Sequence, residues 1–197
     1  MPRSTDTRLK ILSTASKLFQ IQGYHGTGIQ QIIKESGCPK GSLYYYFPEG
    51  KEQLAEEAIN RLLELAFIEL ERFFPPSEHI IDSLEHYFSI LTNFDFDFDH
   101  EGFPLALMAL ETSHMSERLR LACKEAYEAI LQFWERKFIE SGWPQKEAEE
   151  ISFIMFTMME GSSIFAITNK SNEPLKKISE SFMKIVGSKQ RELTDIE

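Results

Sequence analysis

The sequence predicts an all-α protein with about nine helices. Hydrophobic residues recur along most of the chain with the spacing of amphipathic helices, and no sustained alternating run bounded by turn residues indicates a strand. Interruptions rich in proline and glycine divide this pattern into separate helical segments. Because 42% of the 197 residues are hydrophobic and 26% are charged, the chain also has enough apolar material for a packed core.

Three helices are predicted within residues 1–50, which we expect to form a domain of their own. Gly23 and Gly37 end the first two, since glycine readily adopts the left-handed conformation that closes a helix. Thr27 and Gln30 have the spacing of a capping box at the start of the second helix. The third helix runs through "SLYYYF" and ends at Pro48, which cannot continue the hydrogen bonding of a helix.

Six further helices are predicted in residues 51–197, a larger helical domain. Pro75 and Pro76 end the first of them, and the segments "GWP" and "NKSNEP" separate the later ones. Their expected ranges are 51–74, 77–93, 105–112, 117–141, 145–169 and 173–187.

Three Phe-Asp pairs, residues 94–99, interrupt the helical pattern. Their alternating aspartates imitate the start of an EF-hand loop, but His100 stands where glycine is required and Ala106 where a bidentate glutamate is required. We therefore predict no metal ligand and no cofactor. The expectation is a mobile loop that covers the entrance of a pocket with its phenylalanines turned inward, with a metal site in this loop as the alternative.

Charge is unevenly distributed along the chain. Residues 1–51 hold seven Lys or Arg and three acidic residues, whereas the remainder holds 14 Lys or Arg and 28 acidic residues. This asymmetry predicts a polyanion-binding head on a solvated acidic body, with ordinary surface scatter as the alternative. Cys38 and Cys123 lie far apart, and neither a signal peptide nor an apolar run of bilayer length is present. We expect a protein of the reducing cytoplasm that has no membrane partner.

The third predicted helix has two different faces. At about 100° per residue, Leu43, Tyr46 and Phe47 share one side, which predicts that they pack against the two preceding helices. The rest of the helix then presents Lys40, Gly41, Ser42, Tyr44 and Tyr45 outward. Phenol hydroxyls and lysines donate to phosphate oxygens, and aromatic rings contact thymine methyl groups. The pattern therefore predicts a helix-turn-helix whose second helix binds DNA.

The segment "TGIQQIIKESGCPKGSLYYYFPEGKEQLAEEA" resembles the DNA-binding motif of the TetR family of bacterial transcriptional regulators. The matching residues are Gly37, Gly41, Leu43, Tyr44, Tyr46, Phe47, Lys51, Glu52 and Leu54. The resemblance covers residues 6 to about 60, and beyond them only the nine-helix layout agrees. It implies that Thr27 and Lys51 contact phosphates at helix N-termini. It also implies that Lys40, Gly41, Ser42, Tyr44 and Tyr45 lie in the major groove.

Two positions depart from the commonest family pattern. "FPEGKEQL" holds one residue more between Phe47 and Lys51, and Gly28 replaces the Ser or Thr often seen after Thr27. The turn "FP-x-GKE" is similar to that of the LmrA/YxaF-like subgroup, members of which respond to flavonoid-type aromatic compounds. The resemblance therefore implies a small, planar hydrophobic effector.

The larger helical domain, residues 51–197, contains the residues expected to bind this effector. Met beside flat aromatic rings suits an apolar planar molecule, although packing is the alternative for each of them. Glu111 and Glu160, on otherwise apolar segments, are expected as polar anchors, or else as surface carboxylates. The full expected set is Phe67, Phe88, Leu91, Met108, Glu111, Trp134, Phe156 and Glu160.

The last two predicted helices carry apolar residues on more than one face, so we expect them to pack against a partner. In the family, such a pair builds a four-helix dimer interface. The leading hypothesis is a homodimeric, cytoplasmic bacterial repressor that leaves a palindromic operator when its effector binds. The alternatives are an all-α carrier or enzyme that uses the aromatic pocket, and a scaffolding protein. Against the enzyme, no catalytic arrangement of Ser, His, Cys or Asp is evident.

Overall fold

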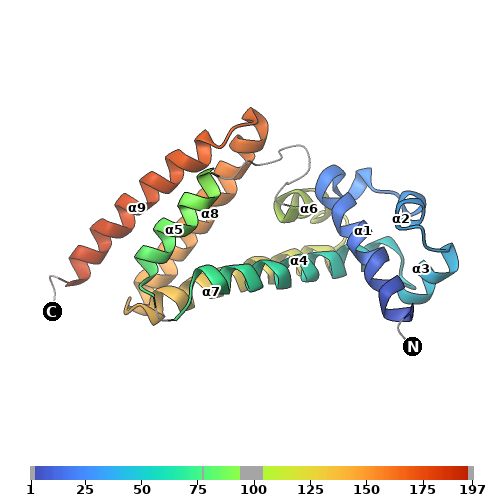
Figure 1. Cartoon of the computed structure of the whole chain (residues 1–197), viewed down its shortest axis with the longest axis horizontal. Coiled ribbons are helices and arrows are strands. Elements are labelled where there is room, and N and C mark those ends of the chain that lie inside the picture. Colours follow the sequence, from blue (N-terminus) through green and yellow to red (C-terminus); the bar gives the residue numbers. More distant parts are fainter. Residues whose placement is uncertain (1–2, 77, 94–103, 195–197) are drawn as a thin grey trace. The chain divides into compact units, whose positions relative to one another are not determined.

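The computed structural model describes residues 3–76, 78–93 and 104–194. Within these ranges the chain forms nine helices and no strand, which confirms the predicted fold class (Figure 1). The helices are α1 (Arg3–Gly26), α2 (Ile29–Ser36), α3 (Lys40–Tyr46), α4 (Lys51–Phe73), α5 (Ile80–Asn93), α6 (Pro104–Thr112), α7 (Glu117–Glu140), α8 (Gln145–Asn169) and α9 (Glu173–Thr194). The Phe-Asp pairs and their expected loop lie outside the described residues.

Several predicted helix boundaries are wrong for identifiable reasons. Helix α9 continues through Gly187 to Thr194, because a single glycine is tolerated inside a helix whose other residues favour it. Helix α5 begins at Ile80, whose N–H donates to Ser141 Oγ at 3.2 Å. A side chain from α7's end thus satisfies one of the free donors in the first turn of α5.

The predicted capping box at the start of α2 is also wrong. Gly28 is the N-cap residue, and no side chain caps this helix. The Thr27 hydroxyl instead donates to the carbonyl of Gly23, four positions earlier, at 2.7 Å. Gly23 interrupts α1 with φ 74° and ψ 179°, so the predicted break at this glycine is confirmed.

Two compact units share the chain, and the boundary between them passes through α4 between Ala66 and Phe67 and through α7 between Tyr127 and Glu128. The first unit contains α1, α2, α3, α6 and the N-terminal parts of α4 and α7. The second contains α5, α8, α9 and the C-terminal parts of α4 and α7. The structural division is therefore distinct from the functional boundary predicted at residue 50, which stays a prediction.

The first unit is built around α1, which packs against α2, α3 and α6. Its core is formed by fully buried apolar side chains, Ile11, Ala15, Phe19, Ile32, Leu43, Phe47 and Leu54. Burial of each large apolar side chain contributes roughly 1.5–3 kcal/mol. This core holds α2 and α3, which have 8 and 7 residues and are too short to be stable alone.

The second unit has an aromatic core. The rings of Phe74, Tyr87, Phe133 and Trp134 pack mostly edge to face, with Phe74 and Trp134 centroids 4.8 Å apart. Beside them, the ammonium of Lys137 is buried and donates to Glu71 and to the carbonyl of Phe74, both at 2.7 Å. A buried charge is tolerated only when it is paired in this way, and the pairing fixes the end of α4.

Candidate nucleic-acid interface

Helices α2 and α3 are joined by a short turn. Gly37 closes α2 in the left-handed conformation with φ 63° and ψ 18°, as predicted. Pro39 then serves as the N-cap of α3, and its carbonyl accepts hydrogen bonds from Ser42 and Leu43. Two short helices joined by a glycine-containing turn are a helix-turn-helix.

One face of α3 is buried and the other is exposed. Leu43 and Phe47 have no exposed surface, whereas Tyr45 is 78% exposed and Tyr44 is 43% exposed. The predicted division of the tyrosines is confirmed, since Tyr46 is half-buried and lies edge-on to Tyr45 at 4.9 Å. Helix α3 therefore leaves two phenols uncovered by its own unit.

The polar residues of the same face surround these phenols. Lys40 and Gly41 are exposed and Ser42 is half-buried. The ammonium of Lys40 lies 5.9 Å from the centroid of the Tyr44 ring. Hydroxyl, ammonium and aromatic groups are thus gathered on one short helix, which is the chemistry that contacts phosphates and base edges.

Thr27 and Lys51 lie at the starts of α2 and α4. Thr27 is fully buried, with its hydroxyl bonded to Gly23 and its N–H bonded to the carbonyl of Tyr24 at 3.3 Å. A phosphate contact through this hydroxyl stays a prediction and requires that bond to open. The Lys51 ammonium lies 4.2 Å from the centroid of the Tyr24 ring. Burial lowers the pKa of Lys51, and the negative charge of Glu111 opposes this effect.

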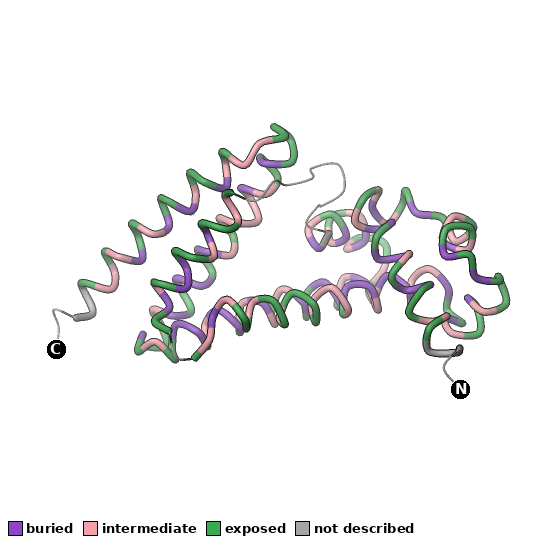
Figure 2. The backbone as a smooth tube through the Cα atoms, in the orientation of Figure 1, coloured by how far each residue is buried: buried purple, intermediate pink, exposed green. Residues whose placement is uncertain are grey.

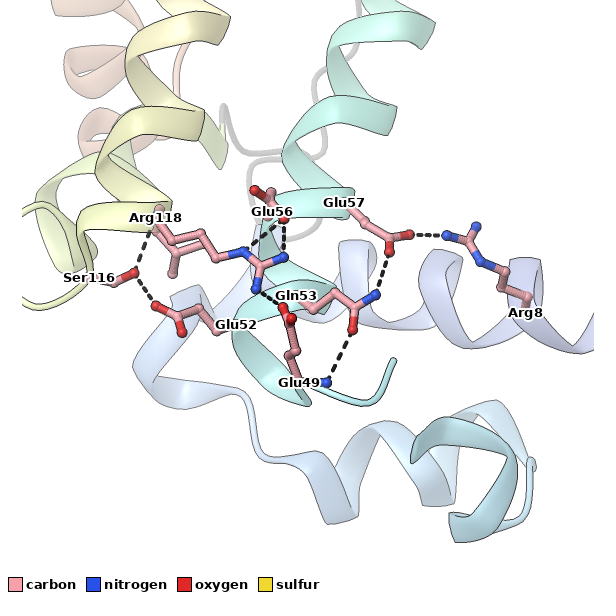
Figure 3. Close-up of polar contacts among 9 residues, drawn as sticks. Arg8, Glu49, Glu52, Gln53, Glu56, Glu57, Ser116 and Arg118 are labelled. Carbon is pink, nitrogen blue, oxygen red and sulfur yellow. Dashed lines mark hydrogen bonds and ion pairs between the residues drawn. The ribbon is translucent and has the colours of Figure 1, made fainter. Parts of the chain in front are cut away.

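The turn between α3 and α4 is tied down by an ionic network (Figure 3). The guanidinium of Arg118, on α7, binds Glu49 in the turn and donates to Glu56 of α4 at 2.5 and 2.8 Å. Glu49 also donates its N–H to Gln53 at 3.2 Å. The longer "FPEGKE" turn therefore supplies an acid that α7 holds in place.

The same network continues to α1 and to the start of α7 (Figure 3). Gln53 donates to Glu57 at 3.0 Å, and Glu57 in turn pairs with Arg8 of α1. Ser116 bonds to Glu52. The first turns of α4 are thus joined to α1 and α7, and three of their acids, Glu52, Glu56 and Glu57, are engaged in internal contacts. Sequence reasoning missed these contacts because the partners are far apart in the chain.

Glu111, predicted as a polar anchor for the effector, contacts the backbone of α1. Its carboxylate accepts the N–H groups of Tyr24 and His25, at 2.5 and 3.1 Å. Glu111 and the buried Met108 both belong to α6 in the first unit. The predicted ligand residues are therefore divided between the two units.

The other six predicted ligand residues belong to the second unit. Phe67 stacks on Phe133 at 5.6 Å, and Trp134 belongs to the same aromatic cluster. Phe88 is buried and contacts the Phe182 ring edge to face at 6.0 Å. The remaining members, Leu91, Phe156 and Glu160, are half-buried. Burial raises the pKa of the Glu160 carboxyl to about 7.

Helix α8 exposes much of its apolar surface. Buried and exposed positions follow one another along α8 and α9, so each helix has a covered side and an uncovered side (Figure 2). The large exposed side chains on the two helices are Phe153, Ile154, Ile164, Phe165, Ile167 and Ile185. No apolar run of bilayer length was expected, but among the helices that the structure describes α8 alone is long and apolar enough to cross a membrane, and 28% of its apolar stretch is buried.

The chain matches two family models. Residues 11–58 match "Bacterial regulatory proteins, tetR family", and residues 76–181 match "Transcriptional regulator LmrA/YxaF-like, C-terminal domain". The chain is 46% identical to the HTH-type transcriptional regulator LmrA of Bacillus subtilis over 178 residues, covering 88% of this chain and 93% of that protein. It is 38% identical to the uncharacterized regulator YxaF of the same organism, covering 93% and 97% of the two chains.

Solved structures agree with the observed fold. A TetR-family regulator from Cytophaga hutchinsonii superposes with a TM-score of 0.82 at 21% identity, covering 95% of this chain and 96% of that one. The reduced form of NemR from E. coli gives a TM-score of 0.78 at 21% identity, covering 90% and 95%. The two family models and the relatives at 46% and 38% identity show that the chain belongs to the TetR family, in its LmrA/YxaF-like group, and is a DNA-binding transcriptional regulator.

Proposed function

We propose that the protein is a homodimeric repressor that binds a palindromic operator and leaves it when a small planar hydrophobic effector binds. The exposed face of α3 carries this proposal, since Tyr44 and Tyr45 are uncovered beside Lys40 and Ser42. In this assignment the tyrosines contact bases and backbone in the major groove, while Lys40 and Lys51 pair with phosphates. Gly41 lets the DNA backbone approach α3 closely.

The dimer forms through α8 and α9. A soluble chain rarely leaves such an apolar surface uncovered, and Phe165 alone is 65% exposed. A second copy of the same surface is its natural partner, because two-fold interfaces are self-complementary. The two recognition helices of such a dimer read half-sites about 34–36 Å apart, or one turn of DNA.

The effector binds in the second unit. Its aromatic side chains suit a flat apolar molecule, and Glu160 supplies a polar group on the helix that also carries Phe156. We assign the polar anchor to Glu160, since the Glu111 carboxylate is already bound to the backbone of the first unit. The flavonoid-like effector class is carried over from the resemblance of the "FP-x-GKE" turn to the LmrA/YxaF-like group. A soluble regulator of this kind acts in the bacterial cytoplasm.

A mobility-shift titration tests this function. The probe is the DNA upstream of the protein's own gene, with and without a panel of planar aromatic compounds, at two salt concentrations. We expect binding that weakens as salt rises and is abolished by one class of compound. Binding that no compound alters contradicts the effector, and the absence of sequence-specific binding contradicts the operator.

A carrier or enzyme that uses the aromatic unit is the alternative. It predicts that a compound binds the protein with no effect on DNA. The relatives are named as transcriptional regulators, which favours the regulator.

A further inference from the structure

A carboxylate from α6 holds the connection between α1 and α2. Gly23 breaks the helix with φ 74° and ψ 179°, which turns the next two N–H groups toward α6. Both of them, from Tyr24 and His25, donate to the same Glu111 oxygen, Oε2, at 2.5 and 3.1 Å. The His25 ring adds a contact of 3.3 Å between Nε2 and the Glu111 carbonyl oxygen.

Gly23 makes room for this carboxylate. A Cβ atom at this position would lie 2.6 Å from Glu111 Oε1 and 2.7 Å from Oε2, closer than real Cβ contacts allow. The positive φ also disfavours any other residue. The positive φ of Gly23 and its lack of a Cβ atom thus both allow the Glu111 carboxylate to lie against the backbone.

The held segment leads directly to the helix-turn-helix. The carbonyl of Gly23 accepts the Thr27 hydroxyl at 2.7 Å, and the carbonyl of Tyr24 accepts the Thr27 N–H at 3.3 Å. Gly28 follows as the N-cap of α2. The ammonium of Lys51 lies 4.2 Å from the centroid of the Tyr24 ring, and the charge of Glu111 acts on it. Glu111 therefore contacts the segment just before α2, and its charge acts on the first residue of α4.

We propose that Glu111 is a positioning residue for DNA binding, whose carboxylate fixes the Gly23–His25 backbone and through it the orientation of α2. The inference rests on the DNA-binding function of the family. Its affinity test also rests on the proposed operator. It separates two properties of Glu111. The position of the oxygen atom holds the backbone, and the negative charge only weakens the attraction between Lys51 and DNA.

Three variants separate position from charge. Glu111→Gln keeps an oxygen that accepts the same hydrogen bonds but removes the charge, whereas Glu111→Ala removes both. Glu125→Ala is the matched control, since Glu125 is an exposed acid on α7 in the same unit. The measured quantity is a ratio of two DNA affinities. The first is for a sequence that the wild-type protein enriches from a random DNA pool, and the second is for unrelated DNA of the same length.

We expect Glu111→Ala to lower this ratio about 10-fold. That factor corresponds to the loss of about one hydrogen bond that holds the segment before α2. Glu111→Gln and Glu125→Ala should stay within about twofold of the wild type. A Gln variant as weak as the Ala variant would show that charge is the cause, and an unchanged Ala variant would show that Glu111 positions nothing. Either outcome overturns the proposal.

Amide hydrogen exchange without DNA gives an independent readout. The Tyr24 and His25 amides should exchange faster in Glu111→Ala and at the wild-type rate in Glu111→Gln. Unchanged exchange in the Ala variant overturns the positioning role of Glu111, whether or not the wild-type protein enriches an operator. A wild-type protein that enriches no operator contradicts the proposed function instead. Glu111→Asp, whose shorter side chain withdraws the carboxylate, replaces the Ala variant if that variant does not fold.

Discussion

Helices α3 and α8 both leave aromatic side chains exposed, but with different chemistry around them. On α3 the exposed rings are the phenols of Tyr44 and Tyr45, beside the ammonium of Lys40. On α8 they are the phenyl rings of Phe153 and Phe165, among exposed isoleucines. The first surface can donate hydrogen bonds to phosphates and bases, while the second can only be stabilised by losing contact with water.

The difference teaches that exposure alone does not identify a partner. Aromatic rings with hydroxyl and ammonium groups suit DNA, which is polar and anionic, and rings among aliphatic side chains suit another apolar surface. We therefore assign α3 to the operator and α8 to a second copy of the chain. Substitutions on the two helices should have effects that do not overlap.

The largest effect is expected from a charge on α8. Phe165→Glu places a carboxylate in the proposed dimer interface, and its desolvation should weaken dimerisation about 100-fold or more. Analytical ultracentrifugation across a concentration series measures this constant. Tyr45→Glu, at an aromatic position on α3 that is also exposed, is the matched control and should leave the dimer intact. Equal dimerisation of wild type and Phe165→Glu would contradict the assignment of α8.

A smaller effect is expected from α3. Tyr45→Ala should weaken binding to the enriched DNA about 10-fold, since one aromatic contact is lost, and should not change dimerisation. Fluorescence anisotropy with labelled DNA measures the affinity. Tyr45→Phe keeps the ring and removes the hydroxyl, so it shows which group matters. An Ala variant with wild-type affinity would remove Tyr45 from the DNA-contacting surface.

The smallest effect concerns stability and pH. Burial raises the pKa of Glu160 to about 7, so between about pH 4.5 and 7 the folded chain binds more protons at this group than the unfolded chain does. The free energy of unfolding therefore falls as pH rises through that window, and it stays lower above about pH 7. Glu160→Gln removes the loss and should add about 1 kcal/mol at about pH 8, a value discounted for the partial exposure of the group.

Urea denaturation of wild type and Glu160→Gln at about pH 5 and about pH 8, at one protein concentration, checks this expectation. The variant should have a higher free energy of unfolding than the wild type only at about pH 8. A constant difference between the two proteins at both pH values would show that Glu160 does not titrate in this window.

Helical periodicity predicted the fold and the exposed face of α3. The wheel position of Leu43 and Phe47 was sufficient, because a short helix must bury its apolar side to be stable. The bounds of α8 were predicted as the structure has them, since Pro144 and the polar residues after Asn169 mark its ends. The end of α9 was missed because Gly187 lowers helix propensity without forcing a break.

The contacts around the helix-turn-helix could not be predicted from the sequence. Glu111 is 87 positions from Tyr24, and Arg118 is 69 positions from Glu49. Such pairs depend on how α6 and the start of α7 pack against α1 and α4 within the first unit, which periodicity does not specify. The sequence did carry one indication, the predicted break at Gly23, but it did not reveal that a carboxylate fills the space there.

The most direct test of the account is the sequence that the protein selects from random DNA. Wild-type protein should enrich one palindrome, with two inverted half-sites whose centres are about one turn of DNA apart. That result would link the exposed face of α3 to the proposed dimer through α8 and α9. Enrichment of a single half-site would contradict the proposed dimer, and a pool with no enriched sequence would contradict specific recognition by α3.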